Sequence, residues 1–301
     1  MKARQVPVLV TWDVDPNDYF DPAQKHTSMQ AALDLCADLG IRATFFFVAR
    51  EAAEYHDEIN AIQRSGHEVG CHGLTHGAEE EYQRLPEAMQ RRFLDEATRI
   101  LENLSGIRIT AFRGPRVKVS ATTLRVLGEF GYLTDSSVCS QRLDLVSANP
   151  INVGWLIAPR VPYHPHRDNV FRRGDLPVLE VPIAAAGLPL ISTSLYVLRL
   201  GVMKTLLRLL HAEARATGKP IVYLAHPEEF GPQSFPFKLS ELSLASLRAH
   251  GLMLRKRLNE RDPASRLRLN RALLSFCASL PGVHFVTMRD VALGASGAPA
   301  M

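Results

Sequence analysis

Short apolar runs typical of β-strands alternate along the chain with longer segments whose apolar residues recur at helical spacing. The runs predict strands at Val6–Val14, Ala43–Val48, Glu68–His72, Ala111–Arg113, Tyr132–Asp135, Val178–Val181, Ile221–His226 and His284–Thr287. The helical patterns predict helices at Ser28–Leu39, Glu51–Ser65 and Pro86–Leu104, each of which ends near a glycine. This alternation indicates βα units around a parallel sheet.

About eight such units predict an α/β fold, a distorted (β/α) barrel of about seven to eight parallel strands. An open doubly wound sheet is the alternative. A chain of 301 residues without a linker-like stretch is expected to form one domain over residues 1–301. Residues 231–301 are expected to complete the barrel with helices, and Gly294–Met301 to form a frayed tail.

The segment Val181–Leu198 carries no charge and is about long enough to span a bilayer. It also contains Pro182, Gly187 and Pro189. These residues fit a buried strand, a turn and a helix start better than they fit a membrane helix.

Composition favours an ordinary soluble protein, because 46% of the residues are hydrophobic and 22% are charged. The four cysteines (Cys36, Cys71, Cys139 and Cys277) are scattered, which argues against a disulfide framework or a cysteine zinc knuckle and favours a reducing compartment. The first apolar stretch is too short for a signal peptide and runs directly into a strand pattern. We therefore expect the protein to be cytoplasmic.

The net charge of +4 is unevenly distributed: residues 191–301 hold 15 Lys+Arg against 7 Asp+Glu. Nucleic acid is not expected as a partner, because these cations lie on leucine-rich helices without interleaved aromatic residues. Ser194–Arg215 and Leu239–Arg271 show this pattern. Their cations either keep an outer helix face solvated or hold the protein peripherally on an anionic membrane.

Candidate chemistry begins at the first strand. Its alternation places Leu9, Thr11, Asp13 and Asp15 on one face, so the two carboxylates are neighbours at the carboxyl end of the strand. Barrel enzymes build their sites at that end. A role in capping the following turn is the structural alternative.

The third strand ends in His72, and His76 follows four residues later. If the chain turns helically after His72, both imidazoles share a face and can meet one metal ion. Two histidines and one carboxylate, with positions left open for water, are typical of a hydrolytic zinc site.

Four runs of the sequence occur in an order that resembles the polysaccharide deacetylase family. They are Thr11–Asp15, Gly66–His76, Phe112–Arg116 and Leu224–Pro227, and with them the resemblance covers about residues 6–230. The family's fold is a distorted (β/α) barrel. The resemblance implies that Asp15, His72 and His76 are metal ligands, and that Asp13 is the general base that takes a proton from the attacking water.

The resemblance also implies roles for residues of the third and fourth runs. Arg113 is expected to hold Asp13 charged and oriented. The backbone N–H of Arg116 matches the family's oxyanion donor. His226 matches the general acid that protonates the departing amine. The family's Asp-Trp pair is absent, and Glu180 is our candidate to orient His226.

Two departures from the family pattern bear on the substrate. Val14 separates the two aspartates, a spacing that resembles the branch of lipid-linked sugar deformylases and small-ureide amide hydrolases. A proline-rich insert carries Trp155, Tyr163, His164 and His166. These side chains either line a substrate groove or pack the loop.

The sequence therefore predicts a metal-dependent hydrolase that removes an N-acetyl group from an amino sugar on a glycan, lipid-linked or nucleotide-linked saccharide. One divalent ion is expected, zinc by default, although cobalt, nickel or manganese also suit these ligands. A deformylase, a ureide hydrolase and a catalytically silent glycan-binding protein are the alternatives. The sequence does not define the oligomeric state.

Overall fold

All eight strands expected from the hydrophobic pattern are present in one sheet of the computed structural model, which describes residues 5–18, 20–142, 153–231 and 262–294. They are β1 (Val6–Val14), β2 (Ala43–Phe47), β3 (Glu68–Cys71), β4 (Ala111–Phe112), β5 (Thr134–Asp135), β8 (Leu179–Glu180), β11 (Ile221–Ala225) and β12 (Val283–Phe285). Seven follow the order β11-β1-β2-β3-β4-β5-β8, and β12 pairs with β1. Every pairing in this sheet is parallel.

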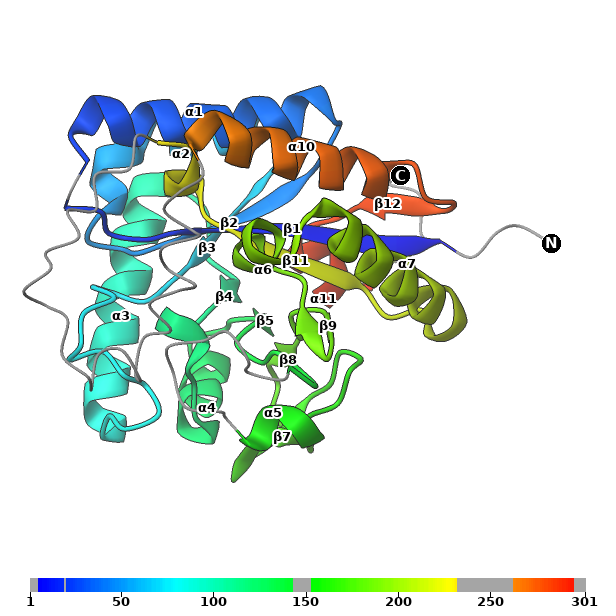
Figure 1. The fold of residues 1–301 in the computed structure, drawn as a ribbon. Coiled ribbons are helices and arrows are strands. Elements are labelled where there is room, and N and C mark those ends of the chain that lie inside the picture. The colour runs from blue at the N-terminus through cyan, green and yellow to red at the C-terminus, as the bar shows by residue number, and fades with distance from the viewer. Residues whose placement is uncertain (1–4, 19, 143–152, 232–261, 295–301) are drawn as a thin grey trace, which may run out of the picture.

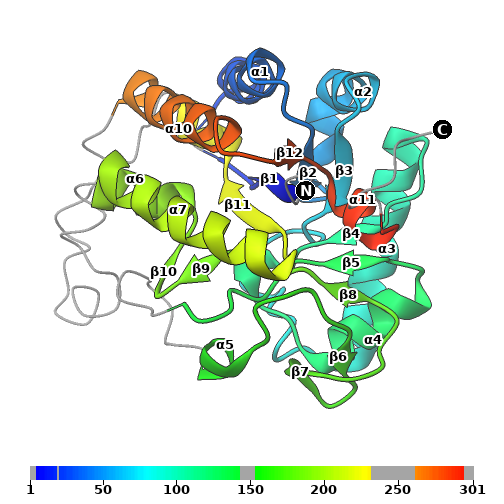
Figure 2. The same ribbon diagram turned by 90° about the vertical axis from the view of Figure 1, so that its right-hand side faces the viewer.

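The sheet curls into an incomplete barrel with helices outside it, which confirms the predicted distorted (β/α) barrel. The longer elements are α1 (Pro22–Asp38), α2 (His56–Arg64), α3 (Glu87–Ser105), α4 (Ala121–Glu129), α7 (Leu200–Thr217) and α10 (Pro263–Ala278). In Figure 1, α1 and α10 lie above β1, and α3 and α4 lie on the opposite side. The end-on view in Figure 2 shows these helices as a ring around the strands.

The shorter elements connect or cap these units. They are η1 (Ala52–Tyr55), η2 (Pro115–Val117), α5 (Val153–Ile157), α6 (Ser192–Leu198), η3 (Pro227–Phe230) and α11 (Met288–Ala292), together with the antiparallel pairs β6 (Pro165–His166) with β7 (Asn169–Arg173) and β9 (Ala185–Ala186) with β10 (Leu188–Pro189).

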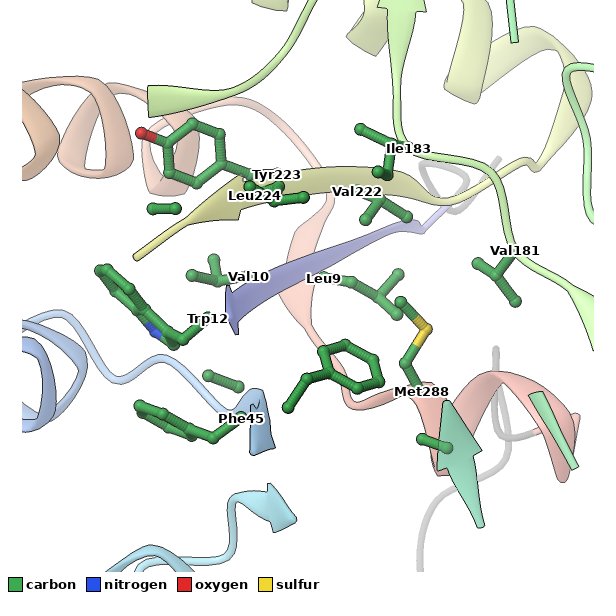
Figure 3. Close-up of a cluster of buried hydrophobic side chains, with 14 of the residues drawn as sticks. Leu9, Val10, Trp12, Phe45, Val181, Ile183, Val222, Tyr223, Leu224 and Met288 are labelled. Carbon is green, nitrogen blue, oxygen red and sulfur yellow. The ribbon is translucent and has the colours of Figure 1, made fainter. Parts of the chain in front are cut away.

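The barrel interior is filled by apolar side chains from opposite sides of the sheet. Figure 3 shows Leu9 of β1, Val222 of β11, Val181 beyond β8 and Met288 of α11 in one cluster. All four are at most 1% exposed. This packed interior leaves the strand ends as the place where polar chemistry can be exposed.

Helix boundaries differ from the expected ones at two places. The first helix begins at Pro22 rather than Ser28, because Asp21 and Gln24 form a capping box: Gln24 N–H donates to Asp21 Oδ1 at 2.8 Å, and Asp21 N–H donates to Gln24 Oε1 at 3.1 Å. The predicted helix Glu51–Ser65 is divided into η1 and α2.

The uncharged segment Val181–Leu198 contains β9, β10 and α6, as the prolines and glycine in it indicate. Within the described ranges, no helix is both long and apolar enough to cross a bilayer. Much of the predicted basic segment Leu239–Arg271, including Arg255–Arg257, lies outside the described residues, as does most of the predicted tail.

Candidate active site

The predicted site residues converge at the carboxyl ends of neighbouring parallel strands. Asp13 lies near the end of β1, His72 follows β3, Arg113 follows β4 and His226 follows β11. Since parallel strands end on the same edge of the sheet, this topology brings residues about 200 positions apart into contact.

Asp15, His72 and His76 offer one ligand atom each, and these atoms all lie within 4.8 Å of one another. Asp15 Oδ1 is 3.2 Å from His72 Nε2 and 3.6 Å from His76 Nε2. The histidines do not meet through a helical turn, the route that their spacing of four residues would allow. An irregular loop joins them, in which Gly73 has a φ of 84° and His76 a φ of 59°. These left-handed residues fold the loop back toward His72.

The donor chemistry of this triad fits a divalent metal ion. His72 Nδ1 lies 2.7 Å from the carbonyl oxygen of Arg113, which only accepts, so Nδ1 carries a hydrogen and Nε2 is the ring nitrogen that faces Asp15. Asp15 Oδ1 is buried yet has no hydrogen-bond donor of good geometry among the described residues. A buried acceptor that faces two imidazole nitrogens is what a cation site requires.

The charges around Asp15 favour its ionised form. Burial by itself raises the pKa of Asp15, but the close contact with His72 and the charges of His72, His76 and His226 outweigh burial and hold the pKa well below its usual range. The side chain of Asp15 remains 24% exposed, so it is accessible to a ligand.

Asp13 and Arg113 form a buried ion pair beside the triad. Arg113 Nη1 donates to Asp13 Oδ1 at 2.7 Å and to Thr11 Oγ1 at 2.8 Å. Its Nε and Nη2 donate to the carbonyl and hydroxyl of Ser136, each at 2.9 Å. Asp13 is 2% exposed, and its Oδ2 lies 3.9 Å from His72 Nε2. Arg113 therefore fixes the orientation of Asp13, with one carboxylate oxygen toward the triad.

Arg116 lies in η2 with a φ of 57° and a ψ of 21°. Its guanidinium donates to the carbonyl oxygens of His76 at 2.8 Å and Gly77 at 2.7 Å. The side chain is thus occupied by the loop that carries His76, while its backbone remains the expected oxyanion donor.

His226 completes the site at the end of β11, which pairs with β1 on the side away from β2 and β3. Its Nε2 lies 4.0 Å from Asp15 Oδ2, and its Nδ1 lies 3.2 Å from Glu229 Oε1. Burial lowers the pKa of His226, but the charges of Glu228, Glu229 and Asp15 and the hydrogen bond with Glu229 outweigh it and raise the pKa well above its usual range. His226 is therefore arranged to carry a proton.

Glu229 is itself held by a buried polar network. Its two carboxylate oxygens accept hydrogen bonds from Ser192 Oγ and Tyr196 Oη, each at 2.7 Å. Asn270 donates to Tyr196 Oη at 2.8 Å, and Tyr223 Oη lies 2.5 Å from Asn270 Oδ1. The sequence pattern alone did not single out Glu229, because it is one of two consecutive glutamates and spacing does not separate it from Glu228.

Glu180, our candidate to orient His226, lies elsewhere. Its Oε1 accepts a hydrogen bond from Val138 N–H at 3.0 Å, and its carboxyl group lies beside Asp135. Burial and the Asp135 charge raise the pKa of Glu180 well above its usual range. The pair supports the strand end that carries Ser136, and so acts on the Arg113 side of the site. The carboxylate that contacts His226 is Glu229.

The aromatic residues of the insert pack the loop. Trp155 and Tyr163 are 7% and 2% exposed, and Tyr163 Oη donates to the carbonyl of Val170 at 2.6 Å. His164 Nδ1 lies 2.9 Å from the carbonyl of Leu176. His166 is half-exposed, in the β6–β7 hairpin. These contacts favour the packing interpretation.

Comparisons with known proteins agree with this arrangement. The family model "Polysaccharide deacetylase" matches residues 2–134. The peptidoglycan deacetylase-like protein FGM2 of Gibberella zeae is 30% identical over 115 residues, or 37% of this chain and 33% of FGM2. The chain spans about a third of the length of the curated relatives it matches.

Solved structures show the same fold over nearly the whole chain. A protein from Mycobacterium smegmatis assigned by name to the polysaccharide deacetylases gives a TM-score of 0.64 at 20% identity, covering 97% of this chain and 91% of its own. The allantoinase PuuE gives 0.59 at 17% identity, covering 97% and 90%. The ordered motifs, the family model over residues 2–134 and the shared fold together support an assignment to the polysaccharide deacetylase family.

Proposed function

We propose that this protein is a metal-dependent hydrolase that removes the N-acetyl group from an amino sugar. One observation carries the proposal: the candidate metal triad Asp15, His72 and His76 is adjacent both to a buried carboxylate, Asp13, and to a carboxylate-supported imidazole, His226. Amide hydrolysis needs a base on the side of the attacking water and an acid on the side of the leaving amine. This arrangement supplies both.

Asp15, His72 and His76 would hold the ion. A divalent ion bound there would lower the pKa of water and polarise the amide carbonyl. Zinc is the default for two imidazoles and one carboxylate, and cobalt, nickel or manganese would also be accepted.

The other residues act by holding or moving protons. Asp13 accepts the proton of the attacking water through the oxygen that faces His72, while the ion pair with Arg113 holds Asp13 oriented. The Arg116 backbone N–H stabilises the charge that develops on the carbonyl oxygen. His226 gives its proton to the departing nitrogen, because an amine leaves poorly as an anion, and Glu229 stabilises the charged imidazole.

The choice of an N-acetyl sugar rests on the family and on relatives named as deacetylases. The fold is also that of the allantoinase PuuE, so a ureide hydrolase is the second candidate, and a deformylase is the third. Measuring acetate, formate and ammonia released from N-acetylated sugars, a formylated amino sugar and allantoin distinguishes them. Acetate from the sugars alone supports the proposal, and release of either other product alone contradicts it.

We further propose that a lipid-linked sugar reaches the site from an anionic membrane surface. Supporting this, α7 exposes Val202 and Leu209, at 43% and 60%, beside Lys204 and Arg208. These cations also stack on Phe276, so part of their role is packing. Binding to anionic but not neutral liposomes, weakened by salt, is the expected result of co-sedimentation. Protein that stays in the supernatant with anionic liposomes at low salt refutes membrane contact.

A further inference from the structure

The loop Leu74–Gly77 carries the third candidate ligand, His76, and is neither helix nor strand. Its backbone N–H and C=O groups therefore lack the partners that regular structure provides. His76 also has a left-handed φ of 59°, which is unfavourable for a residue with a Cβ. Something outside the loop has to hold His76 in this conformation.

Glu80 binds the N–H groups of the loop. Its Oε1 accepts a hydrogen bond from Leu74 N–H at 2.7 Å, and its Oε2 accepts from Thr75 N–H at 2.6 Å and His76 N–H at 2.9 Å. Tyr82 Oη donates to Oε1 at 2.7 Å. Glu80 is fully buried, so water does not compete for these donors.

Arg116 binds the C=O groups of the same loop. Its Nη1 and Nη2 donate to the carbonyl oxygens of His76 and Gly77 at 2.8 and 2.7 Å. The carboxylate accepts from one side of the loop, and the guanidinium donates to the other. Both are charged, and hydrogen bonds to charged groups are about twice as strong as neutral ones.

Gly73 is the residue that lets Glu80 approach. A Cβ at this position would lie 2.7 Å from Glu80 Oε1 and 2.8 Å from Pro115 Cγ, and its φ is 84°. Only glycine accepts this backbone conformation and this close approach together. The loop, Gly73 before it and the side chains of Glu80 and Arg116 thus form one unit.

We propose that Glu80 and Arg116 are positioning residues that hold His76 in place for the metal ion. The inference rests on the proposed metal site, and it gives the Arg116 side chain a role separate from that of its backbone. Neither side chain touches the ion. Both act through the conformation of one ligand.

The test is metal affinity, measured by zinc competition titration without substrate. Glu80→Gln keeps the size of the side chain but turns one acceptor into a donor that faces loop N–H groups. Arg116→Met keeps the stem and removes the guanidinium. Each variant should bind zinc about 10- to 100-fold more weakly, the usual effect of losing a group that orients a ligand. Glu81→Gln is the matched control, because Glu81 pairs with Lys118 and Arg84 instead of the loop, and it should bind zinc normally.

A positioning role also predicts non-additivity. In a His76→Ala background, Glu80→Gln and Arg116→Met should cost no further zinc affinity, because the ligand through which they act is gone. If either variant binds zinc as the wild type does, or loses the same factor in both backgrounds, the proposal is wrong for that residue. Arg116 is only half-buried, so Arg116→Met supplies the answer if Glu80→Gln fails to fold. Zinc binding by the wild type with no turnover of any acylated sugar would refute the proposed function alone.

Discussion

Replacing Glu229 by glutamine tests the assignment of the general acid. The carboxylate lies 3.2 Å from His226 Nδ1 and is fixed by Ser192 and Tyr196. Glutamine keeps the size and one acceptor of the side chain, but it removes the negative charge that stabilises protonated His226. The fold and the metal triad should be unaffected, because Glu229 contacts none of the three candidate ligands directly.

The size of the effect follows from the contact. A hydrogen bond to a charged group contributes about 1.5–3 kcal/mol. The side chains of Glu229 and His226 are 12% and 25% exposed, so solvent screens the pair only partly. At about 1.4 kcal/mol per factor of ten, the loss corresponds to roughly a 10- to 150-fold fall in kcat. His226→Ala, which removes the acid itself, should cost about 10²- to 10⁴-fold.

The assay compares two leaving groups. Hydrolysis of an N-acetylated sugar requires a proton on the leaving nitrogen, whereas a 4-nitrophenolate leaves from its acetate ester without one. Glu229→Gln should therefore slow amide hydrolysis by roughly 10- to 150-fold. Ester hydrolysis should stay within about two- to threefold of the wild-type rate, because its leaving group needs no general acid.

Equal losses on both substrates would refute the reasoning, because they would show that Glu229 supports the site as a whole. Glu228→Gln is a useful comparison, since it removes a neighbouring charge without removing the contact to Nδ1. A larger change in the ratio of the two rates for Glu229→Gln than for Glu228→Gln would assign the effect to the contact with Nδ1 rather than to charge alone.

Three further predictions follow from the site and the core. His72→Ala with His76→Ala should abolish stoichiometric zinc, and full occupancy by metal analysis would exclude the triad. Asp13→Asn should keep zinc but lose activity by about 10²- to 10⁴-fold. Near-normal turnover would show that another residue is the general base. Burial raises the pKa of Glu68 to about 7, so the folded state holds this proton more tightly than the unfolded chain. Stability should fall as pH rises from about 4.5 to 7, by up to about 3 kcal/mol, and denaturant titrations of Glu68→Gln should lack this dependence.

The sequence predicted the fold well because the longer strands of the sheet are buried on both faces. All nine residues of β1 are buried, and such continuous apolar runs leave little ambiguity about where the long strands lie. The first helix was placed too late because its start depends on a polar cap, Asp21 with Gln24, and an apolar pattern does not register this signal.

The sequence predicted those residues of the candidate site that lie at or directly after the end of a strand. Asp13, His72, Arg113 and His226 are placed by the sheet, so the order of strands brings them together. The path of the loop that carries His76 could not be predicted from spacing: a helical turn was one route that would bring the two histidines together, whereas Gly73 and His76 are left-handed.

Partners that come from loops or from distant helices could not be predicted from spacing. Glu80 and Glu229 are ordinary acidic residues in runs of acidic residues, and the network behind Glu229 reaches Asn270 on α10. Glu180 lies at a buried strand end, as expected of a residue that orients His226, but its carboxyl group lies beside Asp135 instead. Only the tertiary structure shows which of these glutamates contacts His226 and which binds the loop that carries His76.

The most direct test of the central claim is acetate release by chelated and reloaded enzyme. Protein stripped of metal should not release acetate from an N-acetylated amino sugar, and one equivalent of zinc should restore the release. The restored activity should be absent in the His72→Ala, His76→Ala double variant. Acetate release by the metal-free wild type, or full zinc-restored release by the double variant, would contradict a hydrolase built on Asp15, His72 and His76.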